Sequence, residues 1–332
     1  MSVSVVIPVY NAQDFIRVAL ASLQTQTLAP LEIIVVNDAS TDDTASVVEA
    51  ACKEDSRIKL INLTKNVGPG GARNVGIANA RGQWIALLDA DDRFAPERLE
   101  RLVRLGNDTG ADIVTDNLLI YDAVAQKVAR TGFRPKEGEP HFAVTLDTFL
   151  YNAAGESTGC DFGLLKPLFR RDALVSRGLR YSASLRHGED FHFMLDALLS
   201  GCVWVCASDA YYLYTERTGS ISKTSSGMSR TKVNYGAMKM ATDELLSRPA
   251  ISDNPRLRAL VARRSQSLRW LDAKTKLISM QRSQGTASVL KTCASDPWIA
   301  WNVGRFLLRR VSRKLNALGH ATLHSTGSRP GR

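Results

Sequence analysis

The sequence has few cysteines, and their arrangement excludes a disulfide framework. The five cysteines are scattered along 332 residues, and none forms a C-x-x-C pair. We therefore expect reduced, mostly buried thiols in a cytoplasmic protein. The chain also lacks a charged leader and any apolar run long enough to cross a bilayer. We expect neither a signal peptide nor a transmembrane helix.

Motifs of several other enzyme classes are absent too. No P-loop or nucleophilic triad is visible, and Gly68-Pro69-Gly70-Gly71 is not a dinucleotide fingerprint. The first predicted strand ends in Pro8-Val9-Tyr10-Asn11, where a NAD-linked dehydrogenase would carry G-x-G-x-x-G. These absences disfavour a dehydrogenase, although its sheet would be similar.

The charge of the chain is unevenly distributed. The net charge is +10, but residues 1–120 hold 11 Lys/Arg against 16 Asp/Glu, whereas residues 255–332 hold 16 Lys/Arg against two acids. Any basic partner surface therefore belongs to the C-terminal part. A nucleic-acid-binding protein is one alternative that such a surface allows, and it would bind with a steep salt dependence.

Four apolar runs in the first 90 residues predict buried parallel strands, and stretches with helical spacing separate them. The runs are Val3–Val9, Leu31–Val36, Ile58–Leu63 and Trp84–Leu88. We expect Ser40 or Thr41 to cap the second helix, and the glycine-rich turn to open a helix over Ala72–Ala80. This βα alternation predicts a doubly wound α/β sheet.

Polar residues follow three of these strands, at Pro8–Asn11, Asn37–Ser40 and Asp89–Asp92. Ligands of doubly wound sheets lie beyond the carboxyl ends of the strands, so one crevice is implied. Acids at a strand end are costly to bury without a cation, and Mg²⁺ or Mn²⁺ binds carboxylate and phosphate oxygens together. An acidic turn is the alternative for an isolated D-x-D.

The ordered set of motifs resembles a family 2 glycosyltransferase of the inverting GT-A fold, similar to enzymes of bacterial exopolysaccharide (succinoglycan-type) biosynthesis. The resemblance covers roughly residues 2–222 and rests on Ile7–Asn11, Val36–Asp42, Asn66 with Gly68, Ala72–Gly76, Leu88–Asp92 and Gly188–Asp190. It implies a Rossmann-like, mostly parallel sheet flanked by helices. It also implies a catalytic domain over 1–225, with a nucleotide-sugar half (1–115) and an acceptor half (116–225), and a basic helical extension over 226–332.

The resemblance implies a UDP-sugar donor. In such enzymes the positions of Pro8, Tyr10 and Asn11 line the uracil and ribose pocket. The expected remaining donor contacts are Asp38, Ser40, Asn66, Gly68, Arg73, Asn74, Asp89, Ala90 and Asp91. Two alternatives stay open: Asp38 as a helix N-terminal acid, and Arg73 as an ion-pair partner of Asp89 or Asp91.

The resemblance implies catalytic roles for the D-x-D acids and for the acids at Glu189-Asp190, where a helix is expected to begin. Asp91, with Asp89, is expected to hold Mn²⁺ or Mg²⁺ on the diphosphate, so the enzyme would be a metal-dependent hexosyltransferase. Asp190 is the candidate general base, since inversion needs a carboxylate opposite UDP. Glu189 and His187 would contact the acceptor or support the site. The alternative is that Glu189 and Asp190 only stabilise the start of the helix.

A late segment and the C-terminus complete the expectations. Arg217, Ser220 and Ser222 resemble a segment that closes over the diphosphate. Residues 298–315 interleave tryptophans with arginines, which suits either an anionic membrane surface or packing on the catalytic domain.

The expected function is transfer of glucose from UDP-glucose to a lipid-pyrophosphate-linked or other oligosaccharide acceptor, in the cytoplasm at the inner face of the plasma membrane. The alternative is another nucleotide-sugar, for lipopolysaccharide or capsule. No nucleic-acid partner is expected.

Overall fold

The computed structural model describes residues 1–155, 160–216, 233–306 and 308. It divides the chain into two compact units, Met1–Arg264 and Ser265–Arg332. The boundary predicted between residues 225 and 226 thus lies within the first unit. The division instead falls inside one long helix, α10 (Pro255–Gln284).

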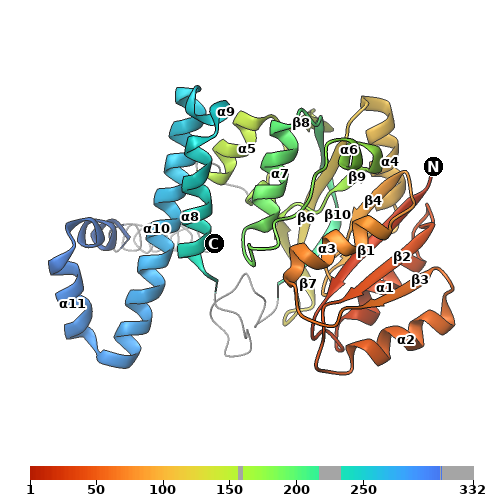
Figure 1. The fold of residues 1–332 in the computed structure, drawn as a ribbon, viewed down its shortest axis with the longest axis horizontal. Coiled ribbons are helices and arrows are strands. Elements are labelled where there is room, and N and C mark those ends of the chain that lie inside the picture. Colours follow the sequence, from red (N-terminus) through yellow and green to blue (C-terminus); the bar gives the residue numbers. More distant parts are fainter. Residues whose placement is uncertain (156–159, 217–232, 307, 309–332) are drawn as a thin grey trace, which may run out of the picture. The chain divides into compact units, whose positions relative to one another are not determined.

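A mixed, mostly parallel sheet organises the first unit (Figure 1). Its strands lie in the order β3-β2-β1-β4-β9-β6-β10-β5, with β7 paired to β6 and β8 to β10. The pairings make β3, β2, β1, β4, β6 and β10 run in one direction. The predicted α/β sheet is therefore confirmed. The strands are β1 (Val3–Val9), β2 (Glu32–Asn37), β3 (Ile58–Asn62), β4 (Trp84–Leu87), β5 (Arg93–Phe94), β6 (Ile113–Asp122), β7 (Lys127–Thr131), β8 (His141–Ala143), β9 (Leu168–Arg170) and β10 (Trp204–Glu216).

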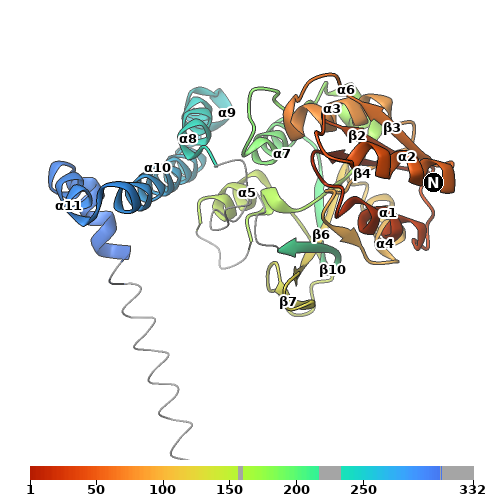
Figure 2. The same ribbon diagram turned by 90° about the horizontal axis from the view of Figure 1, so that it is seen from below.

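Helices cover both faces of this sheet: α1 and α4 lie on one face, and α3 and α6 on the other (Figure 2). The buried apolar residues of β1, β2 and β4 form the core between these layers. Helix α2 packs against β3 and α1 in the nucleotide-sugar half, and the other helices of the first unit lie beside the acceptor half or lead into α10. The helices are α1 (Ile16–Gln24), α2 (Thr44–Glu54), α3 (Gly68–Asn79), α4 (Arg98–Thr109), α5 (Leu146–Ala153), α6 (Arg171–Ser176), α7 (Glu189–Leu199), α8 (Tyr235–Glu244), α9 (Pro249–Ser252), α10 and α11 (Thr286–Ser295), with 3-10 turns at Phe162–Leu164 and Leu245–Ser247.

Helix α3 begins at Gly68, so the predicted start at Ala72 is wrong. The backbone N–H groups of Val67 and Gly68 donate to the two oxygens of Asp38, at 2.7 and 2.9 Å. This carboxylate accepts hydrogen bonds from amides at the helix start, and the helix therefore includes the glycines at 68, 70 and 71. Farther along, a Cβ on Gly76 would lie 2.2 Å from Val6 Cγ1, so this glycine allows α3 to pack closely on β1.

Helix α2 begins at Thr44, so Ser40 and Thr41 do not cap it. Their groups link two strand ends instead. The N–H of Asn11 donates to Ser40 Oγ at 3.0 Å, and the N–H of Thr41 donates to Asn11 Oδ1 at 2.8 Å. Asn11 has a positive φ of 49°, a conformation that asparagine tolerates better than most residues. The ends of β1 and β2 are thereby held together.

The start of α10 is fastened to the acceptor half of the first unit. Arg264 donates to the carbonyl of Ala153 at 3.0 Å and to Asp161 Oδ2 at 3.2 Å, and its guanidinium lies 3.6 Å from the ring centroid of Phe191 on α7. Arg256 forms an ion pair with Asp147 of α5. Residues beyond the predicted catalytic domain thus support α7.

The second unit is helical in its described part. Arg269 lies 3.9 Å over the ring of Trp298, and Trp270 contacts Phe306 with ring centroids 6.3 Å apart. The helix over 297–306 therefore packs one side against α10. Within the described ranges, no helix combines the length and apolar character needed to span a bilayer.

Candidate active site

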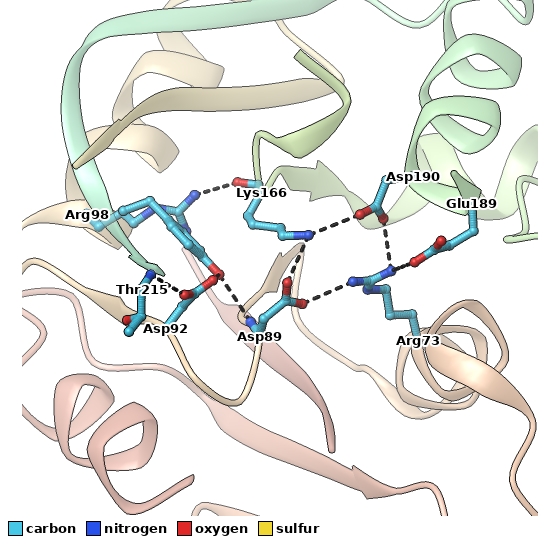
Figure 3. Close-up of polar contacts among 9 residues, drawn as sticks. Arg73, Asp89, Asp92, Arg98, Lys166, Glu189, Asp190 and Thr215 are labelled. Atoms are coloured by element: carbon cyan, nitrogen blue, oxygen red, sulfur yellow. Dashed lines mark hydrogen bonds and ion pairs between the residues drawn. The ribbon is translucent and has the colours of Figure 1, made fainter. Parts of the chain in front are cut away.

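Four charged side chains form a closed ring at the carboxyl end of β4. Arg73 on α3 donates to Asp89 Oδ1 at 3.0 Å and to Asp190 Oδ1 at 2.9 Å. Lys166, just before β9, lies 2.9 Å from Asp89 Oδ2 and 3.0 Å from Asp190 Oδ2. Figure 3 shows the alternation of two cations with two carboxylates. The candidate base and the first D-x-D acid therefore lie together, although they are 101 positions apart in the sequence.

Burial and charge set the protonation states in this ring. Burial disfavours the ionised form of Asp89, but Lys166 and Arg73 outweigh that effect and hold its pKa well below the usual range. Burial likewise opposes the charge of each cation. The carboxylates of Asp190 and Asp89 still raise the pKa of Arg73 and of Lys166 well above their ordinary values. Asp89, Arg73 and Lys166 are thus all charged at neutral pH.

The first turn of α7 supplies two acids in different surroundings. Glu189 accepts a 2.9 Å hydrogen bond from Arg73 Nη1. Burial, and then the charge of Asp190, raise the pKa of Glu189 despite the attraction of Arg73. Asp190 is less buried than Glu189 and is held by both cations. Gly188, with φ of 78°, precedes the helix and allows the chain to turn into it.

A second network fixes the acidic turn from the opposite side. Tyr212 on β10 donates to Asp92 Oδ2 at 2.6 Å and accepts from the N–H of Asp89 at 3.2 Å. The N–H of Thr215 donates to Asp92 Oδ1 at 2.7 Å. Burial, followed by the charges of Asp91 and Asp89, raises the pKa of Asp92 well above its ordinary value. Asp92 thus holds the turn and is not placed to bind a ligand.

The predicted nucleotide side is assembled around Asp38. Asp38 is buried, and both of its oxygens accept from the start of α3. This contact corresponds to the alternative of a helix N-terminal acid, while a uracil contact stays a prediction. Asn66 donates to the carbonyl of Asp38 at 3.0 Å and accepts from Arg186 at 2.8 Å. Tyr10 is half exposed, and Pro8 is partly buried in β1.

Several predicted residues have supporting positions. The amide of Asn74 exchanges two 2.8 Å hydrogen bonds with the backbone of Tyr181, and this pair links α3 to the segment before α7. Burial, and then Arg186, lower the pKa of His187, which is partly buried. Ala90 is buried between the two D-x-D acids. Arg217, Ser220 and Ser222 lie outside the described residues.

The residues present fit a divalent metal held together with a diphosphate. Both oxygens of Asp89 accept from Arg73 or Lys166. Asp91 is partly exposed, and it is the D-x-D carboxylate that would hold such an ion. Magnesium commonly binds through one or two carboxylates plus substrate phosphates. The part of the chain that the structure describes holds no cluster of three or more acidic, histidine or cysteine side chains placed to bind a metal without a substrate.

Two site residues have no counterpart in the sequence prediction. Lys166 stands in the apolar run Leu164-Leu165-Lys166-Pro167-Leu168. A lysine flanked by core residues needs a carboxylate partner, and this was the available signal. Tyr212 lies in the later part of β10, which continues to Glu216 across irregularities in its pairing with β6. No motif marks it.

Comparisons with known proteins identify the family of this chain. Residues 4–171 match the family model described as "Glycosyl transferase family 2". Succinoglycan biosynthesis protein ExoO of Rhizobium meliloti (strain 1021) is 32% identical over 97% of this chain and 90% of that protein. ExoU of the same organism is 35% identical over 66% of this chain and 64% of that protein.

Solved structures show the same fold. The crystal structure of S. aureus TarS 1–349 aligns with a TM-score of 0.58 at 25% identity, covering 80% of this chain and 72% of that one. The same fragment in complex with UDP-GlcNAc aligns with a TM-score of 0.57 at 24% identity, covering 86% and 75%. The predicted GT-A fold is confirmed. The extent of the family match and the ExoO relationship establish that this chain belongs to glycosyl transferase family 2.

Proposed function

We propose that this glycosyltransferase is an inverting, metal-dependent enzyme that transfers a sugar from a UDP-sugar to a lipid-linked saccharide in exopolysaccharide assembly. The role in exopolysaccharide assembly is supported by the relationship to ExoO, a succinoglycan biosynthesis protein. The UDP-sugar donor is supported by the likeness to a TarS fragment solved with UDP-GlcNAc. Glucose is the simplest donor sugar, and another nucleotide-sugar for lipopolysaccharide or capsule is the alternative.

The observation that carries the proposal is the ring joining Asp190 to Asp89. In a single displacement, a carboxylate takes the proton from the acceptor hydroxyl while the diphosphate departs from the opposite face of the sugar. The ring places Asp190, from α7, within one charged cluster with the acids after β4. A divalent ion bound at Asp91 would neutralise charge on the departing diphosphate. Asp190 accepts the proton, and Arg73 and Lys166 orient it.

We propose that the helix over 297–306 brings the enzyme to the membrane that carries its acceptor. On the helix over 297–306, Trp298 and Phe306 lie against α10, whereas Trp301 and Arg305 are exposed. Trp301 is 67% exposed, and Leu308 is 71% exposed. An exposed tryptophan in a strongly basic segment suits the interface of an anionic membrane. We expect peripheral association at the inner face of the plasma membrane, where a lipid-pyrophosphate acceptor would be met.

Isothermal titration with UDP tests the donor site. We expect UDP to bind more tightly with Mn²⁺ than with EDTA, and Asp91→Ala to lose the metal-dependent part. Asp108→Ala, on the exposed face of α4, is the matched control and should bind like the wild type. Absence of UDP binding with and without metal would contradict a UDP donor, and GDP, dTDP and CDP would then be titrated.

A further inference from the structure

Lys166 is the buried cation that joins the candidate base to the acidic turn. Its side chain is 5% exposed, and its Nζ lies about equally close to Asp89 Oδ2 (2.9 Å) and Asp190 Oδ2 (3.0 Å). Arg73 holds the other oxygen of each carboxylate. Each oxygen of Asp190 therefore faces a different cation, one from each half of the catalytic domain. This arrangement fixes the plane of the Asp190 carboxylate as a single contact could not.

The main chain of Lys166 is itself anchored. Arg98 donates from Nη2 to the carbonyl of Lys166 at 2.5 Å, and it also pairs with Asp116 at 2.8 Å. The side chains of Arg98 and Asp116 are both fully buried. The carbonyl of the next residue, Pro167, accepts from the N–H of Leu87 on β4 at 3.2 Å. The ammonium is therefore held near the ring by a rigid backbone, with only its own side-chain torsions free.

Charge balance suggests what this placement does in the reaction. The bond from the acceptor oxygen to the anomeric carbon forms as the bond from that carbon to the diphosphate oxygen breaks, and the electron pair leaves with UDP. The acceptor proton moves to Asp190. Asp190 thus loses its negative charge in the same reaction in which UDP gains one. The two ring cations, which face Asp190, Asp89 and, at Arg73, Glu189, then face one negative charge fewer beside the leaving group.

We propose that Lys166 is a positioning residue for this reaction: it aims the Asp190 carboxylate, and its charge, released as Asp190 is protonated, compensates the charge gained by UDP. The inference rests on the proposed function, with Asp190 as the base. Within the described ranges Lys166 donates to two carboxylates, and an ammonium has three N–H groups, so donating capacity remains.

A purely structural ion pair would behave differently. Loss of a structural partner lowers the free energy of unfolding but leaves the pH dependence of turnover unchanged. If Lys166 has the proposed positioning role, its loss lowers kcat with little change in KM for the donor, because the charge compensation acts mainly in the transition state. It also moves the acid limb of the kcat profile to higher pH, because the carboxylate that takes the proton loses a neighbouring cation.

The test measures UDP release from a panel of UDP-sugars, with water as acceptor, for the full chain and for Lys166→Gln, Lys166→Arg and Lys59→Gln. Lys59 is the matched control, because its Nζ also pairs with a buried carboxylate, Glu32 Oε2, at 2.8 Å. This pair lies outside the ring. We expect Lys166→Gln to lower kcat about 100-fold, in the range of general acid–base effects, and to shift the acid limb upward. Lys166→Arg should recover most of the loss, and Lys59→Gln should match the wild type.

If Lys166→Gln folds poorly, the double variant Lys166→Gln/Asp190→Asn keeps the proposal testable. Without Lys166 the carboxylates of Asp89 and Asp190 repel each other, and neutralising Asp190 removes that repulsion. We expect Lys166→Gln to change kcat less than about threefold in that background, because Lys166 acts through Asp190. Equal losses in both backgrounds, or an unchanged pH profile with a lowered Tm, would overturn the assignment. A wild type that binds UDP but releases none from any donor would contradict the proposed function, and this inference with it.

Discussion

The hydroxyl of Tyr212 donates a 2.6 Å hydrogen bond to Asp92 and accepts one from the backbone of Asp89, so β10 sets the shape of the acidic turn after β4. Both side chains are buried. The N–H of Thr215, farther along β10, donates to the other oxygen of Asp92. The donor half and the acceptor half of the catalytic domain are thereby connected through hydrogen bonds as well as through the ion-pair ring.

Tyr212→Phe should loosen the acidic turn. The change leaves the buried Asp92 carboxylate and the Asp89 N–H without one partner each, which costs about 1–3 kcal/mol of unfolding free energy. Urea denaturation measures this loss, and titration with UDP and Mn²⁺ should show weaker binding. Tyr211→Phe is the control, since its hydroxyl contacts Asp209 at the surface. Equal stability of the two variants would show that the Tyr212 hydrogen bonds do not hold the turn.

Asp38→Ala should destabilise the start of α3. Its carboxylate accepts from two backbone amides there, and loss of an N-terminal cap costs about 0.5–2 kcal/mol. Asp43→Ala is the comparison, because Asp43 precedes α2 without a side-chain capping bond. Thermal unfolding should separate the two variants.

The same Asp38 variant tests the predicted uracil contact. If Asp38 also reads the base, the ratio of UDP to CDP affinity will fall along with stability. An unchanged ratio assigns Asp38 to the helix alone.

Glu32→Gln should lower stability at neutral pH and less so in acid. Burial disfavours the charge of Glu32, but Lys59, Ser4 and Arg81 outweigh it and lower the pKa from 4.5 to about 2. A folded-state pKa below the unfolded value adds stability above about pH 4.5 that is lost as the pH falls toward 2. Urea denaturation at pH 7, 5, 4 and 3 should show the penalty shrinking across this range. A constant penalty would show that Glu32 contributes through packing rather than charge.

Most of the first half of the fold could be predicted because β1, β2 and β4 are buried on both faces. Val3–Val9 is continuous in apolar character and forms β1 at those bounds. The start of α3 could not be predicted, since the three glycines at 68, 70 and 71 disfavour a helix locally and the carboxylate that accepts from its first amides, Asp38, is distant in the sequence. The register of β10 depends on its pairing with β6, which no local pattern reveals.

The site was predictable where motifs carry it and not where a partner arrives from elsewhere. Asp89, Asp190 and Arg73 were all named from the sequence, and the alternative that Arg73 pairs with Asp89 matches the structure. Lys166 was missed, because a single lysine among apolar residues has no characteristic spacing. Its importance follows from the pairing of β9 with β4 and β6, which brings the preceding segment to the ring.

Asp190→Asn should abolish most of the activity while leaving nucleotide binding intact. Loss of the general base should lower turnover by about 10²–10⁴-fold, since the amide cannot take the acceptor proton. UDP affinity should change little. Asp196→Asn, on the same helix and paired with Arg248, is the matched control and should retain activity. Normal turnover by Asp190→Asn would remove this residue from the mechanism.

Proton NMR of the sugar first released from a turned-over α-linked UDP-sugar tests single displacement most directly. With water as acceptor, the wild type should release the β-anomer first, before mutarotation mixes the two forms, and Asp190→Asn should release it far more slowly. Initial release of the α-anomer would contradict inversion and the assignment of Asp190 as its base.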